Sequence, residues 1–395
     1  MRILVCHNLY QSQVPSGEND VVIDLIASLE ALGHEVKPIL VSSDVFVTRR
    51  FISKMFVYGQ ILIGINVKRR LRKEIVEFKP DIIHVHNQFP IIGMSAIKLG
   101  TQKRIPIVQT LHNYRLTCIN GLHLRKGAIC SLCISGKKLG YLNGIIYKCY
   151  RDSFFQSIIA TIFYRAYRKN LSQINHFVTL SDFMKKKVLE LGIPENKISI
   201  INTPYVPVQT TRNNSKRLKQ VLFIGRLSRE KGIKLLIDAW SQSTLKDQGW
   251  TLKIAGVGEL FNEIEQQVSC EKSIFLLGKL NTNQLEALIS VTSVVCLPSL
   301  CYEGFPRTIS QSASLQVPLI LNKVGSLETI GNSSWVVHAD SNVDSWVRVL
   351  DSLSHDKLEE MGVHAYDWWA ANASRLAVFS KLEVIYKNLL DLKEF

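Results

Sequence analysis

The most constraining feature of this sequence is a series of short, nearly continuous runs of Val, Ile and Leu that alternate with amphipathic segments. In the first half, the predicted strands cover residues 2–8, 81–87, 105–113, 176–181 and 197–202. In the second half, they cover residues 220–227, 251–258, 273–280, 293–299 and 317–323. Uninterrupted apolar runs are typical of parallel strands that helices cover on both faces. The sequence therefore predicts an α/β protein built on parallel sheets.

A chain of 395 residues is too long for one ordinary hydrophobic core, so we assign these strands to two domains. Residues 203–219 contain two prolines and two adjacent asparagines without apolar periodicity, which is typical of a linker. We predict one Rossmann-like domain over 1–202 and a second over 220–370. We expect residues 371–395 to form a C-terminal helix that crosses back to the first domain.

The beginning of the chain and its cysteines indicate a cytoplasmic protein. Met1 to Cys6 lead directly into polar His7 and Asn8, which does not fit a signal peptide. No apolar run reaches the roughly 18 residues that a membrane-spanning helix needs. Eight cysteines in a chain of this size fit reduced thiols better than a disulfide framework.

The formal net charge of +15 lies entirely in the first half of the chain. Residues 1–200 contain 28 Lys or Arg and 13 Asp or Glu, a difference of +15, whereas residues 201–395 contain 20 of each. The excess is densest over residues 45–73, where eight Lys or Arg and no acid are interleaved with the apolar run 56–67. A second basic and apolar segment covers 153–170.

Two interpretations of these segments stay open. Apolar groups at the acyl boundary and cations on the headgroups suit an anionic membrane surface, which predicts peripheral association with the inner face of the membrane. Alternatively, both segments are helices packed into a core with solvated basic ends. Nucleic acid is not an expected partner, because no recognised binding motif accompanies the charge and the segments are too apolar for a phosphate-tracking groove.

Ligands of open parallel sheets collect beyond the carboxyl ends of the strands, so the residues that follow each strand are the candidates for a site. Gly17 follows the first strand and begins an amphipathic helix, where backbone N–H groups can approach an anion. An ordinary strand–helix turn has the same pattern. His112 ends another strand and could bond a substrate hydroxyl or carbonyl, or serve as a structural histidine.

The second half offers a candidate diphosphate clamp. Arg226 and Lys231 flank a turn that opens a helix, so that two cations and a helix N-terminus face one strand end. The alternative is two exposed loop cations. A Gly-x-Gly turn ending at Gly258 follows the next strand, but it lacks the third glycine of a dinucleotide fingerprint.

Taken together, these motifs resemble glycosyltransferase family 4, whose members are retaining enzymes of the GT-B fold. In that fold two Rossmann-like domains face each other across a cleft. The matching pieces occur in family order and cover nearly the whole chain: Gly17-Glu18, "TLHN" at 110–113, "SDFMKKKV" at 181–188, "IGRLSREKG" at 224–232, "AGVGE" at 255–259, "LLGKL" at 276–280, "YEGFP" at 302–306 and "VGSLE" at 324–328.

The resemblance implies a role for each of these positions. Arg226 and Lys231 would hold the donor diphosphate, and Glu303 would bond hydroxyls of the donor sugar. His112 would lie against the transferred sugar on its reacting face. The remaining donor-binding positions implied by the resemblance are Gly17, Glu18, Gly225, Gly258, Lys279, Leu280, Gly304, Phe305 and Pro306. Backbone groups near Lys279 and Leu280 would contact the base.

One position departs from the family pattern. The family has a second glutamate eight residues after the first, whereas this chain has Gln311 after Glu303. We expect a helix from about Thr308, with Gln311 near its first turn and close to the nucleotide ribose. An amide accepts through one oxygen only, so a ribose contact would survive in weaker form. We therefore expect the Gln311→Glu substitution to keep or modestly improve donor binding.

The reaction that the resemblance implies places negative charge on a nucleoside diphosphate and positive charge on an oxocarbenium-like sugar. Cations beside the diphosphate and hydrogen-bond acceptors beside the sugar would stabilise these two charges. The sequence contains no Asp-x-Asp pair, so we predict a donor site without a metal in which the Arg and Lys supply the charge.

The cysteines of the insertion after His112 raise a separate question. Cys118, Cys130, Cys133 and Cys149 could hold a structural zinc ion. Their spacing departs from the commonest zinc ribbons, so buried reduced thiols are the favoured interpretation and a structural zinc is the alternative.

Two functions follow from these observations. The first is a hexosyl- or N-acetylhexosaminyltransferase that moves a sugar from a nucleotide-sugar to a lipid-linked saccharide in surface polysaccharide assembly, of O-antigen or capsule type. A UDP-sugar is the favoured donor on family frequency, followed by GDP-mannose. The alternative is a nucleotide-sugar-binding protein of the same fold without transfer activity, to which Gln311 lends weight.

Overall fold

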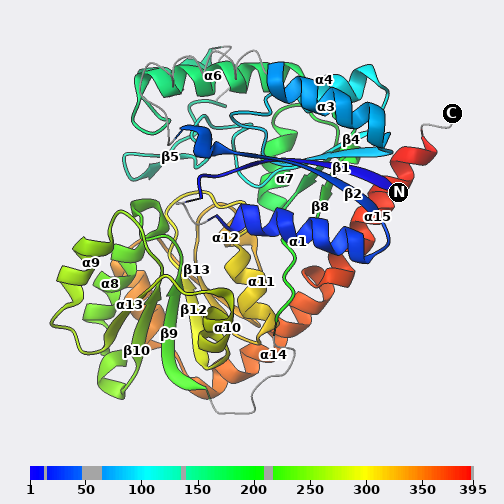
Figure 1. Ribbon diagram of the computed structural model, residues 1–395. Coiled ribbons are helices and arrows are strands. Elements are labelled where there is room, and N and C mark those ends of the chain that lie inside the picture. Colours follow the sequence, from blue (N-terminus) through cyan, green and yellow to red (C-terminus); the bar gives the residue numbers. More distant parts are fainter. Residues whose placement is uncertain (13–15, 47–64, 135–138, 209–216, 393–395) are drawn as a thin grey trace. The chain divides into compact units, whose positions relative to one another are not determined.

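The computed structural model describes residues 1–12, 16–46, 65–134, 139–208 and 217–392 (Figure 1). The chain forms two compact units. Unit 1 comprises residues 1–123, 131–201 and 379–395, and unit 2 comprises residues 124–130 and 202–378. The residues that we assigned to a linker, 203–219, fall within unit 2, and 209–216 lie outside the described residues.

Unit 1 contains a sheet of six parallel strands in the order β2-β1-β3-β4-β7-β8. Their bounds are β1 Arg2–Leu9, β2 Glu35–Ser42, β3 Ile82–Val85, β4 Ile107–Thr110, β7 His176–Thr179 and β8 Ile198–Ile200. Five of them coincide with predicted strands. The sixth, β2, was missed because Glu35, Lys37 and Pro38 interrupt its apolar pattern, which is tolerated at the edge of a sheet.

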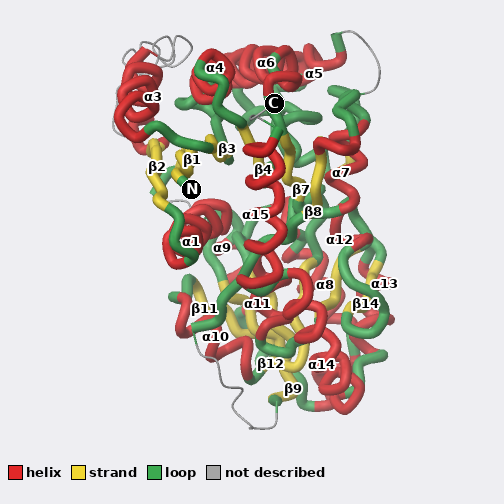
Figure 2. Tube along the Cα trace, turned by 90° about the vertical axis from the view of Figure 1, so that its right-hand side faces the viewer, coloured by secondary structure: helices red, strands yellow, loops and turns green. Residues whose placement is uncertain are grey.

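Helices cover both faces of this sheet. Figures 1 and 2 show α3, α4 and α6 on one face and α1 on the other. The helices of unit 1 are α1 Gly17–Ala31, α3 Ile65–Phe78, α4 Ser95–Gln102, α5 Asn143–Ile146, α6 Phe154–Lys169 and α7 Asp182–Leu189. Helix α15, Arg375–Asp391, begins in the residues of unit 2 and continues into those of unit 1, where Tyr386 is fully buried.

Unit 2 repeats this architecture, with six parallel strands in the order β11-β10-β9-β12-β13-β14. The strands are β9 Leu218–Ile224, β10 Thr251–Ala255, β11 Ile274–Gly278, β12 Thr292–Leu297, β13 Leu319–Asn322 and β14 Val336–Ala339. Strand β14 was missed from the sequence, since it has only four residues and includes His338. The prediction of two parallel-sheet α/β units is confirmed.

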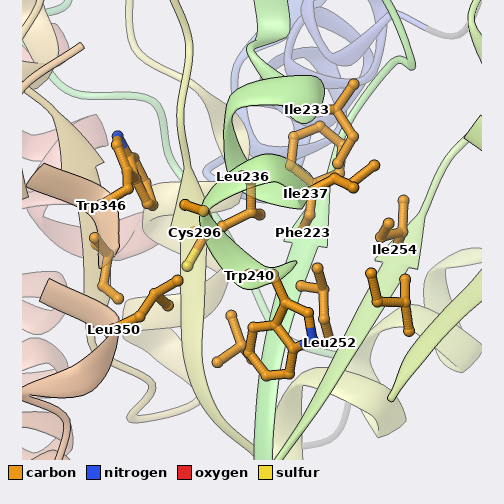
Figure 3. Close-up of a cluster of buried hydrophobic side chains, with 14 of the residues drawn as sticks. Phe223, Ile233, Leu236, Ile237, Trp240, Leu252, Ile254, Cys296, Trp346 and Leu350 are labelled. Carbon is orange, nitrogen blue, oxygen red and sulfur yellow. The ribbon is translucent and has the colours of Figure 1, made fainter. Parts of the chain in front are cut away.

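The helices of unit 2 also lie on both faces of its sheet, with α8, α9 and α13 on one and α10 and α11 on the other (Figure 1). They are α8 Ile233–Gln242, α9 Phe261–Val268, α10 Thr282–Ser290, α11 Arg307–Ser314, α12 Ser326–Thr329, α13 Val343–Asp351 and α14 His355–Asn372. Figure 3 shows the hydrophobic core at α8, which includes Trp240 and Leu236 of this helix, Trp346 of α13 and Phe223 of β9. This core fixes the carboxyl end of β9 against the start of α8.

A two-stranded antiparallel hairpin, β5 Leu124–Arg125 with β6 Ala128–Ile129, lies within the cysteine-containing insertion. Among the described residues, no helix is both long enough and apolar enough to cross a membrane.

Candidate functional site

The carboxyl ends of β9, β10 and β11 meet at one edge of the unit 2 sheet. Ile224 pairs with Ala255, and Ala255 pairs with Gly278, so the turns after these strands are neighbours. Gly258 lies in the turn after β10, where a Cβ atom would stand 2.3 Å from the carbonyl oxygen of Leu227. A glycine is therefore required there for the two turns to approach each other. Gly225 directly follows β9 and has no comparable steric requirement.

Arg226 and Lys231 lie on the turn between β9 and α8, as the sequence predicts. The Arg226 guanidinium donates from Nη2 to Glu230 Oε1 at 2.9 Å, and the same oxygen accepts from Ser228 Oγ at 2.7 Å. The Arg226 side chain is 43% exposed, so it remains accessible to a ligand. Gly232 ends the turn with a φ of 69°, in contact with the backbone of Pro298, and only glycine fits this approach.

Lys231 and Glu303 form an ion pair across the ends of two adjacent strands, β9 and β12. Lys231 Nζ donates to Glu303 Oε1 at 2.6 Å, and Ser299 Oγ donates to the same oxygen at 2.7 Å. Burial alone would raise the pKa of Glu303, but the charge of Lys231 and these hydrogen bonds hold its pKa below the usual value. Burial would lower the pKa of Lys231, and Glu303 raises it. Both groups are therefore charged at neutral pH.

The Gly304-Phe305-Pro306 turn leads from Glu303 into α11, which begins at Arg307. Phe305 is 6% exposed, and its ring stacks on Trp368 of α14 at a centroid distance of 6.0 Å. The Phe305 carbonyl oxygen accepts a hydrogen bond from Thr203 Oγ1. The packing of Phe305 against Trp368 thus fixes the position of the turn, and this holds Glu303 at the strand end.

Gln311 lies in a buried hydrogen-bond network. Its Nε2 donates to the Tyr205 hydroxyl at 3.1 Å, and that hydroxyl donates to the carboxylate of Glu286. Glu286 also accepts from the backbone N–H of Val208. These side chains are 5%, 2% and 1% exposed for Gln311, Tyr205 and Glu286. The amide of Gln311 therefore serves as the donor that completes the network, a partner that the sequence did not indicate.

Lys279 and Leu280 immediately follow β11, at the same edge of the sheet. Lys279 is exposed and Leu280 is partly buried. The backbone then enters α10 through Asn281, which caps the helix in a reciprocal arrangement with Gln284. This capping box fixes the course of the backbone after the two residues.

In unit 1, the turn after β1 leads into α1, whose first residue is Gly17. The Ser16 side chain caps this helix by accepting from the Asn19 backbone N–H. Glu18 Oε2 accepts from the Tyr10 hydroxyl at 3.0 Å and from Asn113 Nδ2 at 3.4 Å. Glu18 Oε1 is buried and has no hydrogen-bond partner within the described residues. A buried acceptor of this kind is suited to a hydroxyl donor from a ligand.

His112 lies in a pocket of unit 1 together with Glu18, Asn113 and His86. His86 Nδ1 and His112 Nε2 are 2.8 Å apart, and their rings stack with a centroid distance of 5.1 Å. The structure therefore brings Glu18 and His112 together, although they are far apart in the sequence.

Behind His86 lies a second buried imidazole. The rings of His84 and His86 are 4.3 Å apart, and His84 also bonds the hydroxyls of Thr110 and Tyr386, each at 2.7 Å. Burial lowers the pKa of His84 to about 3, and that of His112 to about 4. Burial and the neighbouring histidines also hold the pKa of His86 well below its usual value. The imidazoles are therefore neutral at physiological pH and act as hydrogen-bonding groups.

His86 is a site residue that the sequence reasoning missed. It belongs to a predicted strand, and the alternation of His84 and His86 in "DIIHVHN" was the available signal. Arg115 was also missed. It lies three residues after His112 and lines the same pocket.

The four cysteines of the insertion, Cys118, Cys130, Cys133 and Cys149, all lie within the described residues. Across the described residues, which include all four, no group of three or more His, Cys, Asp or Glu could hold a metal ion. The thiols are reduced, and Cys118 and Cys133 share a hydrogen bond. That bond holds the pKa of Cys118 below the usual value for a thiol, with burial opposing the shift and His123 reinforcing it.

The two basic segments have different surroundings. Residues 47–64 of the first lie outside the described residues. Its remaining part, in α3, buries Leu71 and Ile75 and exposes Arg69, Arg70 and Arg72. The second segment is α6, which buries Ile159, Tyr164 and Tyr167 but leaves three large apolar side chains exposed, namely Phe154 at 56%, Phe155 at 43% and Ile162 at 45%.

Two family models match consecutive parts of the chain. Residues 15–207 match Glycosyltransferase Family 4, and residues 209–368 match Glycosyl transferases group 1. The chain thus contains both of these glycosyltransferase domains, the first corresponding to most of unit 1 and the second to most of unit 2.

Solved structures of glycosyltransferases share this fold over nearly the whole chain. A glycosyltransferase of Rickettsia africae is 19% identical, with a TM-score of 0.66 and coverage of 98% of both chains. HepE of Anabaena, crystallised with UDP, is 15% identical, with a TM-score of 0.65 and coverage of 98% of this chain and 100% of that one. The fold is GT-B.

Among curated sequences, the O-antigen biosynthesis glycosyltransferase WbnH of Escherichia coli is 30% identical over 185 residues, which are 45% of this chain and 50% of WbnH. The matched region spans about half the length of the first curated relatives, between 48% and 56%. The chain therefore has the fold and domain composition of a glycosyltransferase.

Proposed function

We propose that this protein is a retaining glycosyltransferase that moves a sugar from a nucleotide-sugar to a lipid-linked saccharide in surface polysaccharide assembly. The observation that carries the proposal is the convergence of Arg226, Lys231 and Glu303 at the carboxyl edge of the unit 2 sheet. Two cations and a carboxylate at one strand edge match the opposite charges that develop on the leaving diphosphate and on the sugar.

The donor is proposed to be a UDP-sugar. Crystal structures of HepE contain UDP and UDP-glucose, and the fold of that protein covers nearly all of this chain. In transfer, the bond between the sugar C1 and the diphosphate oxygen breaks, and a bond from C1 to an acceptor hydroxyl oxygen forms on the same face. The acceptor proton leaves with the diphosphate. Arg226 and Lys231 would balance the charge of the departing diphosphate without a metal.

Glu303 and His112 are proposed to act on the sugar. Glu303 is ionised, and Lys231 and Ser299 hold its carboxylate at the strand end, where it can accept hydrogen bonds from sugar hydroxyls. His112 would contact the transferred sugar as a neutral imidazole, oriented by its hydrogen bond with His86. A neutral imidazole can donate or accept a hydrogen bond without placing a positive charge beside an electron-poor C1.

A surface polysaccharide role is supported by the similarity to WbnH and by the charge of the chain. WbnH takes its name from O-antigen biosynthesis. The exposed arginines of α3 and the exposed phenylalanines of α6 would favour peripheral contact with an anionic membrane from the cytoplasmic side.

The test is a side-by-side screen of UDP-, GDP- and dTDP-sugars for release of the nucleoside diphosphate, with the Glu303→Gln variant as the control. We expect release from at least one donor above background, and we expect the variant to lose it. Tight binding of a nucleotide-sugar with no release by any donor would instead support a binding protein without transfer activity.

A further inference from the structure

A second pocket of unit 1 adjoins the one that contains His112, and the two share Phe89 and Arg115. The second pocket has a volume of about 40 Å³. A single water needs a cavity of roughly 15 Å³, so the pocket can admit a group of several heavy atoms. Its lining residues with polar groups are Tyr10, Gln11, Ser43, Arg115, Tyr150, Arg151 and Gln156.

Arg115 is held rigidly between two aromatic rings in the wall of this pocket. Its guanidinium carbon lies 4.9 Å from the ring centroid of Phe89 and 5.3 Å from that of Tyr150. Its Nε is buried without a hydrogen-bond partner, and Arg115 forms no ion pair within 4 Å with any described residue. A preorganised arginine that forms no ion pair is suited to bind an anion.

The charge of the pocket wall is uniformly positive. Arg151 lies beside Tyr150, 5.6 Å from its ring centroid, and the lining residues include no Asp or Glu. Residues 82–151, which supply part of the wall, contain ten Lys or Arg and no acid, whereas Asp44 and Asp152 each directly follow a lining residue. Glu18 belongs to the adjoining pocket, where Tyr10 and Asn113 bond it and where its negative charge also acts on Arg115. An anion in the second pocket would therefore meet Arg115, whose charge Glu18 partly balances from the adjoining pocket, and Arg151, with no carboxylate among the lining residues.

An apolar stripe connects this pocket to the surface. Gln156 and Ile159 of α6 line the pocket. Phe155 and Ile162 lie four residues before and three residues after Ile159, so they share its side of the helix. Both are exposed, at 43% and 45%. A chain attached to a group in the pocket could follow this stripe toward a bilayer.

We propose that this pocket binds the phosphate or diphosphate that links the acceptor saccharide to its lipid, with Arg115 and Arg151 as the ligating cations. The saccharide would extend into the adjoining pocket toward His112 and Glu18, and the lipid would run along Phe155 and Ile162. The assignment rests on the proposed function, because it names the acceptor group that the same enzyme would recognise.

Binding can be tested without any turnover. The probe is a short-chain polyprenyl diphosphate in detergent, titrated calorimetrically into the full chain, with inorganic diphosphate and the uncharged polyprenol as comparisons. The test variant is Arg151→Ser, since Arg151 is exposed and its loss should not disturb folding. The matched control is Lys148→Ser, which removes one charge from an exposed residue nearby that does not line the pocket.

We expect the polyprenyl diphosphate to bind more tightly than either comparison compound. Arg151→Ser should weaken it by about tenfold or more, the scale of one charge-assisted hydrogen bond, and Lys148→Ser by less than about threefold. Equal affinities for the polyprenol and its diphosphate would overturn the phosphate assignment. Inorganic diphosphate binding as tightly as the lipid would overturn the lipid source, and equal losses in the two variants would overturn the role of this pocket.

A separate readout distinguishes failure of this proposal from failure of the proposed function. Hydrolysis of the nucleotide-sugar by water needs no lipid acceptor, so in the wild-type chain and in the Lys148→Ser control it reports donor turnover separately from binding of the lipid diphosphate. Donor hydrolysis without lipid diphosphate binding overturns the acceptor pocket alone. Lipid diphosphate binding without hydrolysis of any donor supports the pocket and counts against the proposed transfer.

Discussion

The buried network around Gln311 allows a stability prediction that the sequence could not provide. Tyr205 has one hydroxyl proton, which it donates to Glu286, so its oxygen must accept from the Gln311 amide at 3.1 Å. A glutamate in place of Gln311 would put an ionised oxygen in the position of that amide. Two carboxylates would then compete for one proton in a region where all three side chains are at most 5% exposed.

We expect Gln311→Glu to destabilise unit 2 by about 2 kcal/mol at pH 8, the cost of a lost buried hydrogen bond and an unsatisfied buried acceptor. For a unit of this size that corresponds to about 4–8 °C in Tm. Arg307, whose guanidinium lies 5.2 Å from the Tyr205 ring centroid, would offset part of the charge. Because burial and Glu286 would raise the pKa of the new carboxyl, the loss should shrink as the pH falls toward 5.

The assay is thermal unfolding of the single and double variants across this pH range. In the double variant Gln311→Glu with Glu286→Gln, the network can reverse its direction. The amide that replaces the Glu286 carboxylate can donate to Tyr205, and the Tyr205 hydroxyl can donate to the carboxylate that replaces the Gln311 amide. The double variant should therefore recover most of the lost stability. A single variant as stable as the wild type at pH 8, or a double variant no better than the sum of its parts, would refute this account. Donor titration of the same variants tests the gain in ribose contact that the family pattern suggests.

Four further outcomes are expected. Glu303→Gln should lower turnover by at least about 100-fold, the scale of one transition-state contact, as measured by donor release at saturation. Treatment with EDTA should leave turnover intact, and activity that is lost and then restored by magnesium or manganese would contradict a metal-free donor site. Because burial lowers the pKa of His112 to about 4, below the 6.5 of an unperturbed histidine, the unfolded state binds more protons between these values. Stability should thus fall as pH drops from about 6.5 to 4, checked by urea unfolding. Replacing Arg69, Arg70 and Arg72 with Ser should reduce co-sedimentation with anionic vesicles at low salt, since each cation contributes on the order of 1 kcal/mol; unchanged sedimentation would argue against the membrane role of α3.

The sequence predicted most of the fold because buried parallel strands carry an unmistakable apolar pattern. The pattern fails at the sheet edges, where strands need not be apolar on both faces. Strand β2 has Pro38 and two charged residues and buries only Ile39 among its eight residues. Strand β14 is short, with His338 half-buried at the opposite edge of the other sheet.

The rule that ligands bind beyond the carboxyl ends of parallel strands located the candidate site residues. It could not predict which side chains form hydrogen bonds with them. His86 meets His112 because Val85 pairs with Gln109, a register that no local pattern encodes. Gln311 bonds Tyr205, 106 residues earlier in the chain, and Tyr205 bonds Glu286, 81 residues later. Hydrogen bonds between such distant residues follow from tertiary packing, so their prediction requires the structure.

The pairing of Lys231 with Glu303 has a consequence for how a donor would bind. Arg226 and Lys231 are each already bonded to a carboxylate, Glu230 and Glu303, so the four groups together carry no net charge. A diphosphate that arrives at this edge must draw one or both cations away from those carboxylates. When Lys231 turns toward the diphosphate, Glu303 loses its cation and becomes a stronger acceptor for the sugar hydroxyls. This exchange of partners links binding of the diphosphate by Lys231 to binding of the sugar by Glu303. We therefore expect Glu303→Gln to have opposite effects on the affinity for a nucleoside diphosphate and on the rate of turnover. The variant leaves Lys231 unpaired and should hold a nucleoside diphosphate at least as tightly as the wild type, while its turnover falls.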